Sequence, residues 1–308
     1  MNFADPRSDI AFKKIFGSQQ RSHILISFLN ATLGFCGDRA IATLQILNPY
    51  QAPDIKGLKE SILDVKAKDV SGREFIVEMQ LERDAAFCKR AVYYSAKSYS
   101  QQLGKGQFYD GLQPVYFLGI LNFSVFEGDN PLSRHLILND ETRLQEIKEL
   151  EFNFIELPKF LKREDQLGSV VDKWIYFLKH AVELETVPQS LGSEPAIREA
   201  LEIADQHNWS NAEVDAYEHW GMRERASLLN LELSVREATA AAAARFQSEL
   251  KAETEKRQIA EAERQKAEAE REKAEAERQK AEAKLQQALT HLISTGMNEA
   301  EAKGLLGI

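Results

Sequence analysis

Cysteine is scarce in this 308-residue chain: only Cys36 and Cys88 occur, and their spacing fits neither a disulfide framework nor a zinc site. We expect both to be buried free thiols. The first residues lack the apolar stretch of a signal peptide, and no run approaches the roughly 18 uncharged apolar residues of a membrane span. We therefore expect a cytoplasmic protein without a membrane segment.

Familiar catalytic signatures are also missing. The six histidines are scattered without metalloprotease or triad spacing, and no glycine-rich phosphate loop of the Walker type occurs. The net charge of −9 argues against a nucleic-acid binder, but the charge is unevenly distributed along the chain. Residues 1–110 hold 15 Lys and Arg against 12 Asp and Glu. This basic excess is compatible with a polyanionic substrate.

What the chain does contain is a predicted β-hairpin at residues 61–81. Side chains alternate between the two faces of a strand, so Asp64 and Lys66 share one face, as do Glu78 and Gln80 on the second strand. A three-residue connection at 70–72, closed by a glycine, is a common hairpin turn. This register places Asp64 opposite Glu78.

Two opposed carboxylates repel each other, because their Cβ atoms lie roughly 4.5–5.5 Å apart. A divalent cation between them would remove that cost. Oxygen ligands favour Mg²⁺ or Mn²⁺, and such a cation supports hydrolysis of a phosphodiester by an activated water. The alternative is a hairpin with one polar, solvated face, and periodicity alone does not exclude it.

Other elements follow from capping signals and hydrophobic periodicity. We predict one or two helices from Asp9 to Gly34, a strand at 40–48 before the hairpin, and a helix at 84–103 after it. The apolar run at 114–122 is typical of a central strand buried on both faces. Further strands are expected at 135–139 and 152–157. The order is helix, three strands, helix, strand, which indicates an α/β fold.

The predicted helix at 84–103 presents one polar face. Its members recur at helical spacing and project together: Lys89, Arg90, Tyr93, Lys97 and Gln101. Such a face binds a phosphate backbone or is simply solvated.

The second half of the chain is expected to be helical. We divide the chain into a core at 1–160, a helical cover at 161–238, a charged helix at 239–290 and a short helical tail at 291–308. From Ala260 the sequence repeats every seven residues without a seam of large apolar side chains. This repeat indicates a solvated single helix or an oligomeric coiled coil, through which a second copy or another partner would bind.

Several separated blocks resemble the PD-(D/E)XK nuclease family transposases, also called recombination-promoting nucleases. The blocks are SDIAFKKIFG, LDVKAKDVSGREFIVEMQ, RAVYYSAKSYSQQL followed by PVYFLGILNF, FIELPKF and WIYFLKHA. The resemblance implies a restriction-endonuclease-like mixed sheet and metal-dependent cleavage of DNA.

Residue by residue, the resemblance implies that Asp64 and Glu78 bind Mg²⁺ or Mn²⁺ and that Asp9 supplements them. Gln80 stands where the motif has lysine. A neutral amide orients water or phosphate but brings no charge. Lys66, Lys89 or Arg90 would then supply the positive charge.

The expected activity is that of a metal-dependent DNA endonuclease linked to recombination or mobile elements. We expect the substrate to be bound by basic and polar side chains of two helices: Lys13, Lys89, Arg90, Tyr93 and Gln101. The rival interpretation is a nuclease fold kept as a non-catalytic scaffold for partners. A strand-transferring transposase is a third option, but no module for binding terminal repeats is legible.

Overall fold

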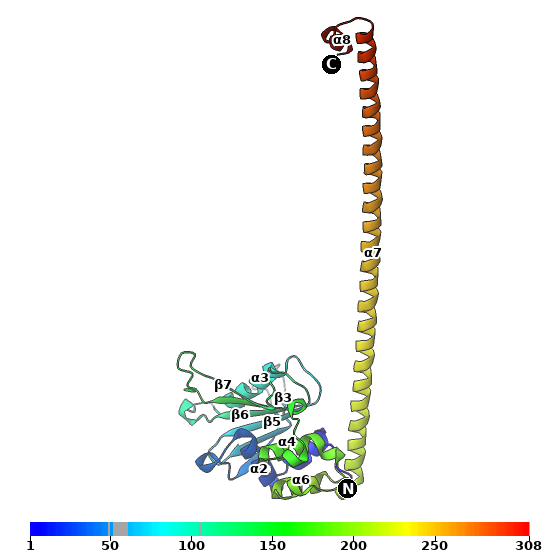
Figure 1. Cartoon of the computed structure of the whole chain (residues 1–308). Helices are drawn as coiled ribbons and strands as arrows, with labels where there is room; N and C mark the ends of the chain where they lie inside the picture. The colour runs from blue at the N-terminus through cyan, green and yellow to red at the C-terminus, as the bar shows by residue number, and fades with distance from the viewer. Residues whose placement is uncertain (49, 52–60, 105, 308) are drawn as a thin grey trace. The chain divides into compact units, whose positions relative to one another are not determined.

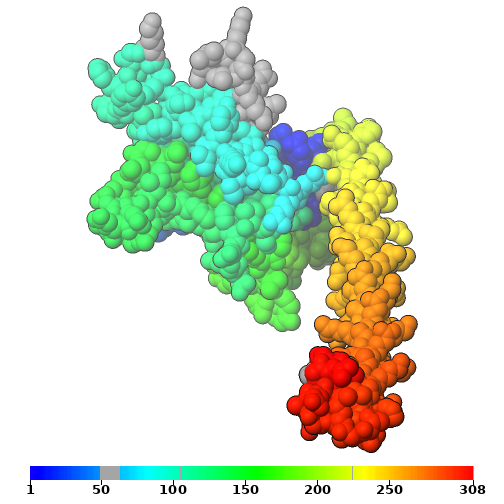
Figure 2. Space-filling model, turned by 90° about the horizontal axis from the view of Figure 1, so that it is seen from above, coloured from blue at the N-terminus to red at the C-terminus, as the bar shows by residue number. Residues whose placement is uncertain are grey.

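The computed structural model describes residues 1–48, 50–51, 61–104 and 106–307. They form two compact units, residues 1–225 and residues 226–308. Figure 1 shows the elements and Figure 2 the molecular surface. The first unit contains the β-sheet and most of the helices, and the second consists of the long helix α7 beyond residue 225 together with α8.

The first unit is built on a six-stranded mixed sheet with the order β1-β4-β5-β6-β8-β7. The strands are β1 (Leu44–Leu47), β4 (Val65–Asp69), β5 (Glu74–Gln80), β6 (Val115–Leu121), β7 (Leu132–Leu136) and β8 (Leu150–Glu156). The β5-β6 and β6-β8 pairs are parallel, and the other pairs are antiparallel. The predicted mixed α/β architecture is confirmed.

The β4-β5 hairpin has the predicted register. Val65 pairs with Val77 and Lys68 with Glu74, so the same register continued by one residue sets Asp64 opposite Glu78. The Asp69 N–H donates to the Arg73 carbonyl at 3.0 Å, which closes a connection of residues 70–72. Gly72 has a φ of 89°, a conformation that favours glycine.

The predicted first strand of the hairpin is interrupted, however. Its start, β3 (Ser61–Ile62), pairs with β2 (Tyr50–Gln51) in a separate two-stranded sheet, and the chain bends at Asp64. Strand alternation would put Leu63 on the same face as Val65, and the bend reverses this. It is buried with Ile76 and Phe87, whereas Val65 packs into the other hydrophobic cluster.

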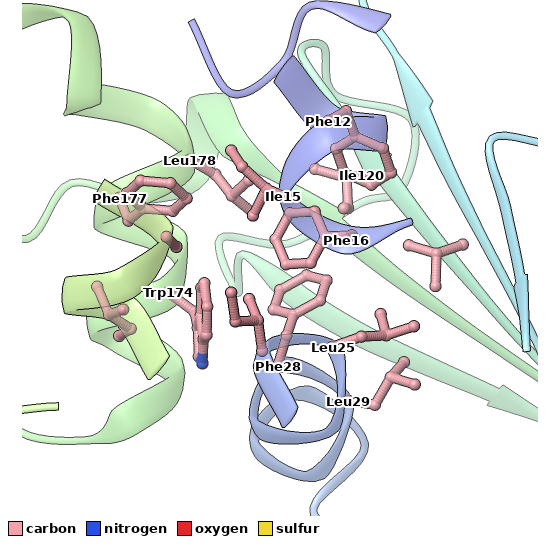
Figure 3. Close-up of a cluster of buried hydrophobic side chains, with 14 of the residues drawn as sticks. Phe12, Ile15, Phe16, Leu25, Phe28, Leu29, Ile120, Trp174, Phe177 and Leu178 are labelled. Atoms are coloured by element: carbon pink, nitrogen blue, oxygen red, sulfur yellow. The ribbon is translucent and has the colours of Figure 1, made fainter. Parts of the chain in front are cut away.

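Helices α1 (Asp9–Phe16), α2 (Ser22–Leu33), α4 (Val170–His180) and α6 (Pro195–Ala204) enclose the larger core on one face of the sheet. Phe16 and Phe28 lie 5.0 Å apart by ring centroid, and Phe28 meets Trp174 edge-on at 5.4 Å (Figure 3). Ser8 caps α1, and Gly34 ends α2 in the left-handed region, at the end of the predicted helical span.

Helix α3 (Phe87–Ser100) covers the opposite face of the sheet and is shorter than the predicted 84–103. Phe87 packs there against Phe117 of β6. Gly119 permits this approach, because a Cβ atom at that position would lie 2.9 Å from the Phe154 ring and 3.1 Å from Phe87. The central strand β6 is buried along its whole length, as predicted.

The hairpin face under α3 is not exposed to solvent. The alternative interpretation of a hairpin with one polar, solvated face is therefore wrong for this part of the hairpin. Ile76 is fully buried, and Lys66 and Glu74 are only 8% and 5% exposed. Lys66 Nζ lies 3.0 Å from Glu74 Oε2, which also accepts a hydrogen bond from the Ser98 hydroxyl. Pairing and hydrogen bonding are what make burial of these charges tolerable.

Two smaller predictions were wrong. The strand expected at 40–48 spans only Leu44–Leu47, because the Asn30 side chain takes both backbone polar groups of Ile41 at 2.8 and 3.0 Å. The cysteines are not both buried: Cys36 is exposed and Cys88 is half-buried.

The long helix α7 runs from Asn211 to Ser294, and α8 spans Glu299–Leu306. A capping box opens α7, with the Ser210 N–H donating to Glu213 Oε2 at 2.8 Å. The short helix α5 (Gln189–Gly192) lies between α4 and α6. Within the described ranges, no helix has the length and apolar character needed to span a membrane.

Candidate active site

Asp64 and Glu78 are held together by backbone hydrogen bonds. The Met79 N–H donates to Asp64 Oδ2 at 2.8 Å, and the Asp64 N–H donates to Glu78 Oε1 at 3.2 Å. The bend at Asp64 makes this reciprocal arrangement possible. Glu78 is only 6% exposed, and its Oε2 receives no hydrogen bond from any residue in the described part of the chain.

A cleft of about 250 Å³ opens over Asp64. It is lined by residues of α1, the hairpin, the segments beside them and the start of α7: Arg7, Asp9, Phe12, Asp64, Met79, Gln80, Leu81, Glu82 and Trp220. Glu78 is buried beside Asp64 and does not itself line the cleft. The two carboxylates predicted from the hairpin therefore lie side by side, and a ligand in the cleft has access to Asp64.

Burial and mutual repulsion dominate the electrostatics of this pair. Burial, followed by the nearby Asp64 carboxylate, raises the pKa of Glu78 to about 8. Burial also raises the pKa of Asp64, and the charge of Asp9 raises it further. The hydrogen bond from Met79 and the charges of Lys13 and Arg90 act in the opposite direction. The site is short of positive charge.

The donor chemistry fits a hard divalent cation. Asp64 and Glu78 present carboxylate oxygens, and among the described residues the buried Oε2 of Glu78 has no hydrogen-bond partner of the kind such atoms normally have. No cluster of three or more His, Cys, Asp or Glu side chains placed to bind a metal occurs among the described residues. Two carboxylates are sufficient for Mg²⁺, which usually keeps several waters and shares substrate phosphates.

Asp9 reaches the site but is engaged elsewhere. Its carboxylate lines the cleft and forms an ion pair with Lys13 at 2.7 Å, one turn along α1. The side chains of Asp9 and Lys13 are 62% and 42% exposed, so this pair is open to solvent and to ligands.

Gln80 is part of a network that fixes Arg90 near the carboxylates. Arg90 donates through Nη2 to Gln80 Oε1 and through Nη1 to Asp84 Oδ2 at 2.7 Å. The Gln80 amide nitrogen donates in turn to the Glu82 carbonyl at 3.1 Å, so the amide oxygen faces Arg90. The guanidinium also lies 5.2 Å from the centre of the Phe87 ring.

The other predicted site residues lie outside the cleft. Lys66 is buried with Glu74 and is not brought to the carboxylate pair. Lys89 and Tyr93 are exposed on α3, and Gln101 directly follows this helix. Their predicted role in substrate binding stays a prediction.

Sequence reasoning did not identify three neighbours of the site. Arg7 lines the cleft and binds the Asp5 carboxylate through two nitrogens, at 2.8 and 2.7 Å. Trp220 lines it from α7. Tyr94 lies near enough for Glu78 to help raise its pKa, after the larger effect of burial. Tyr94 was detectable as the neighbour of Tyr93 in a polar helix, whereas no local signal marks Trp220.

A mixed sheet with helices on both faces, whose antiparallel hairpin brings two carboxylates together, is consistent with the PD-(D/E)XK nuclease fold. The family model of the PD-(D/E)XK nuclease family transposases matches residues 6–228, and the chain belongs to this family. Comparison with curated proteins and with solved structures gave no match.

The raised pKa of Glu78 predicts a pH-dependent stability in metal-free buffer. The folded state holds this proton up to pH about 8, whereas the unfolded side chain, with its ordinary pKa of 4.5, has already lost it. The free energy of unfolding therefore falls as pH rises between these values, by up to about 1.4 kcal/mol per pH unit. Each kcal/mol lowers the melting temperature by roughly 2–4 °C.

Thermal melts in EDTA from pH 5.5 to 8.5 measure this slope. The matched variant is Glu78→Gln, which keeps an oxygen for the Asp64 N–H but does not titrate. We expect the variant to lose most of the slope. An equal slope in both proteins would show that Glu78 titrates normally.

Proposed function

We propose that the protein is a Mg²⁺- or Mn²⁺-dependent DNA endonuclease that acts in recombination or on mobile elements. The observation that carries this proposal is the adjacent pair of Asp64, which lines the cleft, and Glu78, which is buried beside it and has a carboxylate oxygen without a hydrogen-bond donor in the described chain. Membership of a nuclease family supports the reaction type.

In this proposal Asp64 and Glu78 hold the cation, and Asp9 assists at the mouth of the cleft. The cation, when bound, polarises the phosphate and lowers the pKa of an attacking water. The Met79 N–H donates to Asp64 Oδ2 and so fixes the orientation of this carboxylate. The backbone thereby also sets the position of Oδ1, the oxygen that remains for the cation. Such preorganisation is what makes an electrostatic site effective.

Arg90 is the residue we assign to the phosphate. A guanidinium has five N–H donors, so Arg90 retains donors for a phosphate oxygen after it binds Gln80 and Asp84. Gln80 is then a positioning residue that docks Arg90. Lys66 is a poorer candidate, because its ammonium already pairs with the buried Glu74 carboxylate.

The DNA beyond the scissile phosphate is proposed to contact α1 and α3. Lys13 and Lys89 offer charge, while Tyr93 and Gln101 offer an aromatic ring and an amide. Lys97 lies 5.9 Å from the centre of the Tyr93 ring, which adds positive charge to the same exposed face. Dimer formation, and a partner bound through α7, stay predictions.

A nicking assay tests the activity. Purified protein is expected to nick plasmid DNA with Mg²⁺ or Mn²⁺ and to stop in EDTA. Asp64→Asn and Glu78→Gln should each lower the rate by about 100-fold or more, because a cation loses one of two carboxylate ligands. Asp110→Asn, at an exposed carboxylate of the same unit, is the matched control and should cleave normally. Cleavage that survives both site variants would favour a non-catalytic scaffold contaminated by another nuclease.

The assignment of Arg90 has its own test, read as kcat with excess metal. Arg90→Ala should lower kcat about 100-fold, and Gln80→Ala about tenfold, because Asp84 still holds the guanidinium. The double variant Gln80→Lys/Arg90→Ala should recover part of the loss, since it returns a cation to the same place. Lys89→Ala removes a neighbouring exposed charge and should affect KM more than kcat.

The decisive comparison for Arg90 is with Gln80. Full activity in Arg90→Ala together with an inactive Gln80→Ala would mean that the amide acts directly on the substrate, and our assignment would then be wrong.

A further inference from the structure

The first turns of α7 form one wall of the candidate active-site cleft. Residues 211–225 belong to the first unit, and Trp220 from this segment lines the same cleft as Asp64 and Gln80. The indole is half-buried. Its neighbours across the cleft include the carboxylates of Asp9 and Asp64.

This wall is fixed to the core by several contacts around α1. The Lys14 ammonium pairs with the Glu213 carboxylate, and the Asp5 N–H donates to the Tyr217 hydroxyl at 2.9 Å. The Tyr217 ring also meets the Trp209 ring edge-on at 5.6 Å. The position of Trp220 is therefore set by the folded unit rather than by a mobile terminus.

Trp220 continues an aromatic stack without belonging to the hydrophobic core. Its ring lies 5.5 Å from the Tyr217 ring at an interplanar angle of 21°. Tyr217 packs against the larger core, whereas Trp220 is not among the residues that do. The half-buried indole therefore has aromatic surface left over for a ligand in the cleft.

We propose that Trp220 is a stacking subsite for an unpaired nucleobase next to the scissile phosphate. This inference rests on the proposed function, because the carboxylate pair marks where the phosphate lies. A base inside a duplex has both faces covered by its neighbours, so only an unstacked base has a face for the indole. The substrate class is therefore single-stranded DNA, or duplex DNA with an unpaired or displaced base at the cleavage point.

The test is DNA binding in EDTA, where cleavage does not interfere. Labelled oligonucleotides are titrated with the full-length protein, as a single strand and as the corresponding duplex. Trp220→Ala should weaken binding of the single strand about tenfold and of the duplex less than about twofold. Trp220→Phe keeps a ring and should stay within about threefold of the parent.

Met222→Ala is the matched control, because Met222 is 50% exposed on the same helix and does not line the cleft. It should bind both DNA forms as the parent does. An unchanged affinity of Trp220→Ala for the single strand would overturn the inference. An equal loss for single strand and duplex would overturn it too, because it would indicate a general effect on the surface.

Quenching of intrinsic tryptophan fluorescence by DNA tests the stacking directly, because it would not occur if Trp220 had only a structural role. Trp174 and Trp209 are 0% and 8% exposed, so quenching by single-stranded DNA should come from Trp220 and vanish in Trp220→Phe. Cleavage without such quenching would refute the stacking subsite alone. Quenching without metal-dependent cleavage would refute the nuclease assignment and leave the subsite in place.

Discussion

The site depends on one constraint: the carboxyl groups of Asp64 and Glu78 are held next to each other, where burial makes it unfavourable for both to be charged. The backbone offsets part of that cost, because the N–H groups of Met79 and Asp64 each donate to one carboxylate of the pair. Burial still raises the pKa of Glu78 to about 8. The pair persists because the sheet and the helices on both of its faces hold the hairpin in place, and a cation would relieve what the backbone does not.

Each neighbouring element adds a group at this point. Helix α1 contributes Asp9, which lines the cleft, and Lys13, which forms an ion pair with it. Helix α3 contributes Arg90, fixed by hydrogen bonds on two sides. The start of α7 contributes Trp220, anchored through its neighbours to the segment around α1. Residues from three other parts of the sequence thus lie around one pair of carboxylates.

The local parts of this arrangement were predictable from the sequence, and the long-range parts were not. The length of the 70–72 connection was enough to set Asp64 opposite Glu78. Strand alternation put Lys66 on the same face as Asp64, but it does not reveal that Glu74 takes the ammonium or that α3 covers both. Trp220 reaches the cleft only through packing of α7 on the core, which no pattern near residue 220 encodes.

The central claim is that Asp64 and Glu78 together bind a divalent cation, and calorimetric titration of the metal-free protein with Mn²⁺ tests it most directly. At pH 7 binding should displace the proton of Glu78, so the measured heat should change with the ionisation enthalpy of the buffer. Glu78→Gln should bind at least about tenfold more weakly and release no proton. Equal affinity and equal proton release in the two proteins would contradict the account.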